Sequence, residues 1–182
     1  LLNPNDYSEK ELNQFSFNKF TRKEGDLYEL CAYELEFSIP TVVFDILAKK
    51  YSQNNLKLKI TAGSPSKNGG IDFLELQLSI KIQDELLEAQ AGYFESAAIE
   101  IQKQFKGKYK LKNCFGCNYS DYSVYGQGLF GTMFCFANQK IAYLKVKSKA
   151  DYMELAPEKM TVQETFVCEE FEFRGTDIAY RG

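Results

Sequence analysis

The feature that most constrains this fold is a long alternation of apolar and polar residues in the first half of the chain. Across residues 74–82, leucine and isoleucine recur at every second position, with a polar or charged side chain between each pair. The same period of two is found at residues 31–39, 56–60 and 87–91. This period puts alternate side chains on opposite faces of an extended chain, so each run predicts a half-buried strand. Turn-forming segments separate the later runs, which predicts antiparallel hairpins.

One segment of the chain changes its period. After Gly92 the apolar residues follow the helical spacing of 3.6 up to Gly107, which predicts one amphipathic helix over residues 94–106. Residues 41–51 place their apolar side chains on one helical stripe, which favours a short helix and leaves a strand as the open alternative. The fold class expected is therefore α+β, mainly antiparallel β-sheet with one principal helix and a cysteine-rich loop.

The domain organisation expected is a single domain over residues 1–182. A chain of 182 residues can bury one sizeable core, and no internal repeat or long linker divides it. Residues 1–14 are polar and contain a proline, which predicts an irregular arm. Residues 15–20 predict a short strand. Three later segments predict further extended structure, the first two as a hairpin: residues 130–136, 141–146 and 162–173.

Charge and hydropathy exclude several classes of partner. The net charge of −3 disfavours binding to nucleic acid or to anionic lipid. No apolar run is long enough to span a bilayer, and the first residues lack the basic start of a signal peptide, so we expect a cytoplasmic location without membrane contact. The chain does not begin with methionine, so a removed targeting segment stays an open alternative.

The sequence contains no histidine, and this absence restricts the possible chemistry. It removes serine or cysteine nucleophiles paired with histidine, and zinc sites built on histidine pairs. No pair of carboxylates, phosphate-binding glycine loop or activated nucleophile stands out either. We therefore favour a non-catalytic protein over an enzyme.

Cysteines concentrate in a segment rich in glycine and tyrosine. Cys114 and Cys117 are separated by two residues, and Gly116 between them lets the backbone turn so that both sulfurs can face one ion. Cys135 and Cys168 end strand-like apolar runs, so a sheet could bring two more thiolates to the same place. These four predict a structural Zn²⁺ site. Two alternatives stay open: buried cysteines that act as small apolar residues, and a redox pair.

The segment from Cys114 to Gly131 reads CFGCNYSDYSVYGQGLFG, and MFCF, YLKVKSK and QETFVC follow it. Together these motifs resemble a family of small uncharacterised bacterial proteins whose pattern carries a CxxC, a tyrosine-rich YSDYS stretch and two further cysteines downstream. The resemblance covers the C-terminal half. It implies that Cys114, Cys117, Cys135 and Cys168 form a unit that excludes Cys31, and it implies no activity.

The function expected is that of a protein-binding module, for example an immunity-type protein that neutralises a bacterial toxin. Tyrosine and aspartate side chains in the loop after the CxxC provide the amphipathic contact area typical of interfaces. The predicted partner-binding residues are Tyr119, Asp121, Tyr122 and Tyr125. Packing of these tyrosines over the zinc loop is the structural alternative. The functional alternative is a small enzyme that uses a CxxC thiol or an open zinc site.

Overall fold

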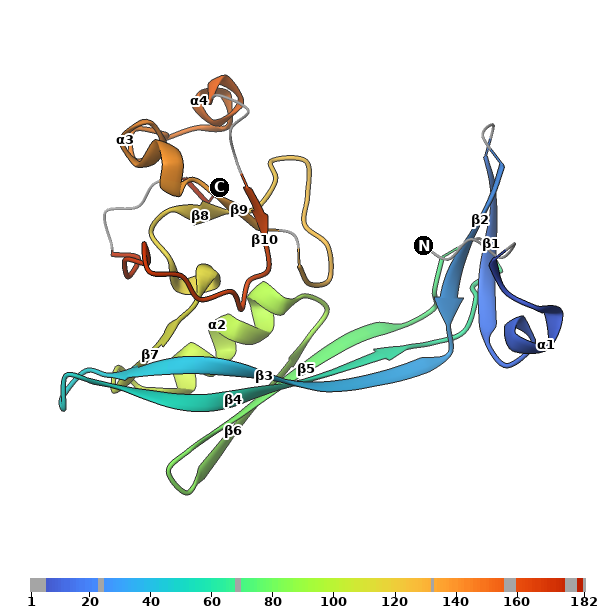
Figure 1. Ribbon diagram of the computed structural model, residues 1–182, viewed down its shortest axis with the longest axis horizontal. Helices are drawn as coiled ribbons and strands as arrows, with labels where there is room; N and C mark the ends of the chain where they lie inside the picture. Colours follow the sequence, from blue (N-terminus) through green and yellow to red (C-terminus); the bar gives the residue numbers. More distant parts are fainter. Residues whose placement is uncertain are drawn as a thin grey trace.

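The computed structural model describes residues 6–22, 25–67, 70–131, 133–155, 160–175 and 180–181. Its centre is a curled, five-stranded antiparallel sheet in the order β6-β5-β4-β3-β7 (Figure 1). The strands of this sheet are β3 (Tyr33–Asp45), β4 (Lys50–Ala62), β5 (Leu74–Ile82), β6 (Glu85–Ala91) and β7 (Tyr109–Lys112). Strands β3 to β6 pair in chain order, and the chain includes several helices. The predicted α+β class with a mainly antiparallel sheet is confirmed.

The alternating pattern becomes one buried face of this sheet. The alternate apolar residues of β4 from Leu56 onward and of β5 from Leu76 onward are almost fully buried. Helix α2 (Phe94–Gln104) packs its apolar stripe against this face and buries Phe94, Ala97, Ala98 and Ile101. Each strand therefore contributes one apolar face to a core that the helix closes.

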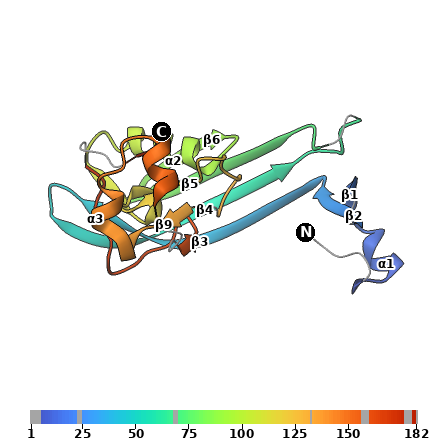
Figure 2. The ribbon, with the colours of Figure 1, turned by 90° about the horizontal axis from the view of Figure 1, so that it is seen from above.

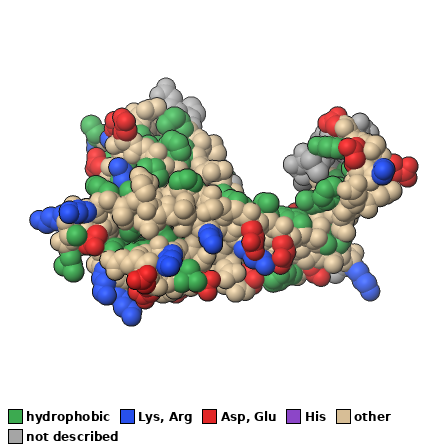
Figure 3. All heavy atoms as spheres, turned by 60° about the horizontal axis from the view of Figure 1, so that its bottom comes forward, with side chains coloured by type: hydrophobic (Ala, Val, Ile, Leu, Met, Phe, Trp, Pro, Cys, Tyr) green, Lys and Arg blue, Asp and Glu red, His purple; other side chains and the backbone are tan. Residues whose placement is uncertain are grey.

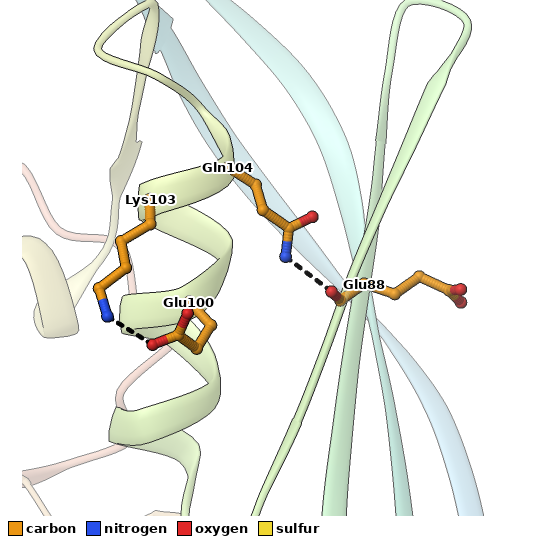
Figure 4. Close-up of polar contacts among 4 residues, drawn as sticks. All are labelled: Glu88, Glu100, Lys103 and Gln104. Carbon is orange, nitrogen blue, oxygen red and sulfur yellow. Dashed lines mark hydrogen bonds and ion pairs between the residues drawn. The ribbon is translucent and has the colours of Figure 1, made fainter.

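Helix α2 ends two residues before the predicted boundary at residue 106. Lys106 and Gly107 have φ values of 50° and 74°, and this left-handed backbone terminates the helix. Just before the end, the Gln104 side-chain amide donates to the Glu88 carbonyl of β6 at 2.7 Å (Figure 4). This bond fixes the last turn of α2 to the edge strand.

The first part of the chain forms a separate hairpin. Strands β1 (Ser16–Arg22) and β2 (Gly25–Cys31) make a two-stranded antiparallel sheet, preceded by the short helix α1 (Glu9–Leu12). The strand expected at residues 15–20 is confirmed. Part of the expected irregular arm is instead α1, capped by Ser8, and residues 1–5 lie outside the described residues. Figures 1 and 2 show the hairpin beyond one end of the long strands, away from α2.

The predicted run over residues 31–39 is divided between two strands. Ala32 has a φ of 53°, and this left-handed residue turns the chain sharply from β2 into β3. The Ala32 amide donates to the Gly63 carbonyl at 2.7 Å, which holds the corner against the end of β4. The apolar and polar residues keep alternating through the corner, so the alternation in the sequence does not reveal the corner at Ala32.

Pro40 does not end the strand that contains it. Strand β3 continues through Pro40 to Asp45, because β7 pairs only with Val42–Asp45 and leaves β3 with one neighbour at the proline. A proline is tolerated where a strand has an open side. The helix favoured for residues 41–51 is therefore wrong. The open alternative, a strand, is correct for residues 41–45 and 50–51.

The C-terminal residues form a second buried cluster beside the sheet. Their three-stranded sheet consists of β8 (Ser120–Asp121), β9 (Met133–Cys135) and β10 (Met160–Val162). The short helices are η2 (Cys114–Gly116), η3 (Ala137–Gln139), α3 (Lys140–Tyr143) and α4 (Lys149–Glu154). This cluster is separate from the main core, so the single-domain organisation stays a prediction.

Two predictions for this part of the chain need correction. A strand is expected at residues 141–146, but Lys140–Tyr143 form α3, and the Val146 amide donates to the Tyr143 carbonyl at 3.0 Å in the turn that follows. Of the extended run at 162–173, only Val162 belongs to a strand, and Phe173 forms an isolated bridge to Cys117. In the described ranges, no helix combines the length and the apolar character that crossing a membrane requires.

Candidate functional site

The CxxC segment forms a tight turn directly after β7. Asn113 caps it, because its side-chain oxygen accepts from the Gly116 amide at 3.1 Å, and the Cys117 amide donates to the Cys114 carbonyl at 3.1 Å. A Cβ added at Gly116 would lie 2.7 Å from the Leu111 carbonyl oxygen. Glycine is therefore required there by the close approach of the backbone, a reason that the sequence pattern did not supply.

The four predicted zinc ligands lie in one region of the C-terminal part. Cys114, Cys117 and Cys135 are buried and Cys168 is half-buried. Burial raises the pKa of the Cys114 thiol to about 12, and the nearby Cys117, Cys135 and Cys168 raise it further. The fifth cysteine, Cys31, is buried at the base of the N-terminal hairpin. The fold thus groups the four cysteines and leaves Cys31 apart from them.

The four thiols are near enough to one another to affect the pKa values of Cys114 and Cys168. Within the described ranges, no three cysteine, aspartate or glutamate side chains form a group that could hold an ion. The four-thiolate Zn²⁺ site therefore stays a prediction. The same burial argues against Cys114 as a nucleophile, because a thiol with a pKa of about 12 is protonated at neutral pH.

Metal analysis tests the zinc prediction directly. Protein purified without chelator is expected to contain about one zinc per chain, and Cys117→Ser is expected to lose it because a structural site needs all four ligands. Cys31→Ser is the matched control, since it removes a buried thiol outside the group, and it should keep the metal. Wild-type protein without zinc would contradict the prediction and leave the two alternatives, buried apolar cysteines and a redox pair.

The predicted partner-binding loop lies mostly inside the protein. Tyr119 and Asp121 are 5% and 2% exposed, and Tyr122 is half-buried against the main core. Only Tyr125 is well exposed, at 80%. Tyr119 and Tyr122 therefore pack inside the protein, and Tyr125 is the most exposed of the four predicted partner-binding residues.

A buried polar network surrounds Asp121. The Tyr143 hydroxyl donates to the Asp121 carboxylate at 2.9 Å, and the Tyr122 amide donates to it at 2.8 Å. Arg174 donates to the Tyr143 hydroxyl at 3.2 Å and also to the Ser120 carbonyl. These residues come from β8, α3 and the C-terminal segment, so the network joins all three elements.

Arg181 completes this network. Its guanidinium donates to the Phe115 carbonyl at 2.6 Å and to the Ser120 hydroxyl at 3.2 Å. The network forms only when distant segments fold together. No local sequence pattern therefore identifies Tyr143, Arg174 or Arg181 as members of it.

Burial changes the protonation of this network. It raises the pKa of the Asp121 carboxyl to about 6, against the opposing effects of its hydrogen bonds and of the two nearby arginines. It also lowers the pKa of Arg181, and the neighbouring positive charge of Arg174 lowers it further. Arg181 therefore shares a confined space with a second cation and with a carboxyl that is partly protonated in mild acid.

Two cavities of about 420 Å³ each adjoin the network, and Arg181 lines both of them. The first lies between α2, β7 and the C-terminal segment and carries the side chains of Lys103, Lys110 and Arg174. The second carries Asp121, Glu95 and Tyr122, whose buried hydroxyl has no hydrogen-bond partner among the described residues. Both cavities have the size of small-molecule sites.

Comparison with known proteins gives a family and no function. No curated protein and no solved structure matches this chain. A family of unknown function, DUF6304, matches residues 1–120. This match spans the N-terminal hairpin, the five-stranded sheet, α2 and the CxxC turn, and it ends before Cys135 and Cys168. The matched region therefore contains only the start of the first of the C-terminal motifs on which the resemblance was based. Because the match covers well over half of the chain, the protein belongs to the DUF6304 family.

Proposed function

We propose that this chain is a non-catalytic protein-binding module and that its N-terminal hairpin, β1 and β2 with α1, is the contact surface. The observation that carries this proposal is the isolation of the hairpin. In the described part of the chain, β1 and β2 pair only with each other. A two-stranded hairpin is marginally stable in water by itself, so a second protein surface would supply the support that it lacks.

The side chains of the hairpin suit a protein interface. Tyr7 and Phe15 are 45% and 56% exposed, and the ring of Phe15 contacts Phe17 with 6.4 Å between centroids. Phe17 in turn meets Tyr28 edge to face at 6.1 Å. Aromatic side chains provide large contact area at a low entropy cost and are enriched in interfaces.

Apolar surface continues from the hairpin onto the long strands. Leu35 and Phe73, which lie near the corner at Ala32, are both at least 45% exposed. Figure 3 shows hydrophobic side chains along this end of the strands and at the base of the hairpin. Extended apolar surface of this kind is unusual on a protein without a partner.

The base of the hairpin is joined to the sheet. The Cys31 side chain is buried there, and the Ala32 amide donates to the Gly63 carbonyl. Burial raises the pKa of the Cys114 thiol, which disfavours an enzyme that uses this thiol as a metal-free nucleophile. An immunity-type role and a structural zinc both stay predictions within this proposal.

A comparative binding experiment tests the proposal. The full chain is used to capture a protein from an extract of its source, and the captured protein is identified and its affinity measured. Phe15→Ser is expected to weaken that affinity about tenfold or more, because truncation of an exposed aromatic anchor at an interface costs more than 1 kcal/mol.

Leu47→Ser is the matched control, because Leu47 is 85% exposed in the turn between β3 and β4, at the other end of these strands. It should leave the affinity unchanged. A captured partner that binds Phe15→Ser as tightly as wild type would move the interface away from the hairpin. In that case Tyr125→Ala tests whether the loop that contains Tyr119, Tyr122 and Tyr125 is the interface, because weaker binding by this variant would place the contact there.

A further inference from the structure

We propose that the cavity between α2, β7 and the C-terminal segment binds a small organic anion, one that carries a phosphate or carboxylate beside an apolar group. This cavity, called the cationic cavity below, has a volume of about 420 Å³. Its charged lining includes Lys103, Lys110, Arg174 and Arg181, and no carboxylate lines it among the residues that the structure describes. Four cations around one cavity favour an anionic occupant.

The two arginines of the cationic cavity are close to each other, and both are partly buried. Both donate to Ser120, Arg174 to its carbonyl and Arg181 to its hydroxyl. The Nε of Arg181 is buried and has no hydrogen-bond partner in the described parts of the chain. An unpaired buried donor beside a second guanidinium is costly, and an anion that accepted from it would offset that cost.

The two lysines stand on the outer side of the same cavity. The Lys110 ammonium lies 5.3 Å from the centre of the Phe173 ring, and no carboxylate pairs with it among the described residues. Lys103 is paired with Glu100 at 2.6 Å, in an exposed ion pair that costs little to exchange (Figure 4). Both ammonium groups can therefore reach a bound anion.

The remaining lining of the cavity is apolar. Phe115 and Phe173 present aromatic rings to it, and Ile99 and Leu111 add aliphatic surface. Binding sites for small molecules typically combine an apolar lining with a few placed polar groups. A simple inorganic ion would leave this apolar surface unused, which is why the expected ligand has an apolar part.

Calorimetric titration with three probes tests the inference. Phenyl phosphate is expected to bind and to raise the unfolding midpoint of the protein, and inorganic phosphate is expected to bind more weakly. Benzyl alcohol, which has the ring without the charge, should not bind. Lys110→Gln is expected to weaken phenyl phosphate binding about tenfold, because it removes one charge-assisted contact.

Lys108→Gln is the matched control. It removes the same charge two residues away, from an exposed side chain that does not line the cavity, and should leave the affinity unchanged. The inference is overturned if neither phosphate probe binds at millimolar concentration, if benzyl alcohol binds as well as phenyl phosphate, or if both lysine variants weaken binding equally. None of these results depends on the protein partner proposed above.

Discussion

Replacement of Phe94 by alanine is expected to lower the free energy of unfolding by about 3–5 kcal/mol. Phe94 is 1% exposed at the start of α2. Its ring lies between two others, with centroids 5.9 Å from Phe115 and 5.3 Å from Phe130. The truncation would leave a cavity where the helix, the CxxC turn and the loop after β8 meet. Chemical denaturation followed by fluorescence or circular dichroism measures the loss.

Ile99→Ala is the control for this substitution on the same helix. Ile99 is 41% exposed, so its truncation creates no internal cavity and should cost about 0.5 kcal/mol. If Phe94→Ala were no more destabilising than Ile99→Ala, the packing of α2 against the C-terminal part would have to be revised.

The second large effect is a pH dependence that Asp121 imposes on stability. Burial raises the pKa of this carboxyl from its ordinary value of 3.8 to about 6 in the folded protein. Between about pH 4 and pH 6, the folded protein therefore binds a proton that the unfolded chain has released. The contribution of Asp121 to the free energy of unfolding consequently falls as the pH rises through this window. A shift of this size corresponds to about 3 kcal/mol.

Asp121→Asn isolates this effect, because an amide replaces the carboxyl without a proton to lose. The difference in unfolding free energy between wild type and Asp121→Asn should change by about 3 kcal/mol between about pH 4 and pH 7. The wild type should become less stable relative to the variant as the pH rises. Asp84→Asn removes an exposed carboxyl in the turn between β5 and β6 and controls for the loss of one acidic group. A constant difference for Asp121→Asn would mean that Asp121 is better solvated than its 2% exposure indicates.

The part of the fold that the sequence predicts is the part with strong periodicity. Strands β4, β5 and β6 and helix α2 follow from alternation and from the change of period after Gly92, because each buries one regular face. The helix favoured for residues 41–51 failed because Val43 and Phe44 fit a helical stripe and a paired strand equally well. Pairing with β4 and β7 decided between them, and a short window of sequence does not contain that information.

The candidate site was harder to predict for a related reason. The grouping of Cys114, Cys117, Cys135 and Cys168 was visible as a motif, but the burial of Tyr119 and Asp121 depends on contacts with α3 and the C-terminal segment. The cationic cavity requires residues from α2, β7 and the last segment to come together. In a sequence, a lysine or arginine that lines a cavity looks the same as one on the open surface. Only the folded structure shows which of them line the cationic cavity.

The pairing of β7 with β3 has a consequence for the order of folding. Strands β3 to β6 form hairpins between neighbours in the chain, which close quickly because little loop entropy is lost. Strand β7 must instead return across β4, β5, β6 and α2 to reach β3. Its docking is a long-range step that we expect to be late. The CxxC turn follows β7 directly, so these thiols would be accessible to oxidants until that step is complete, and refolding would depend on a reducing medium.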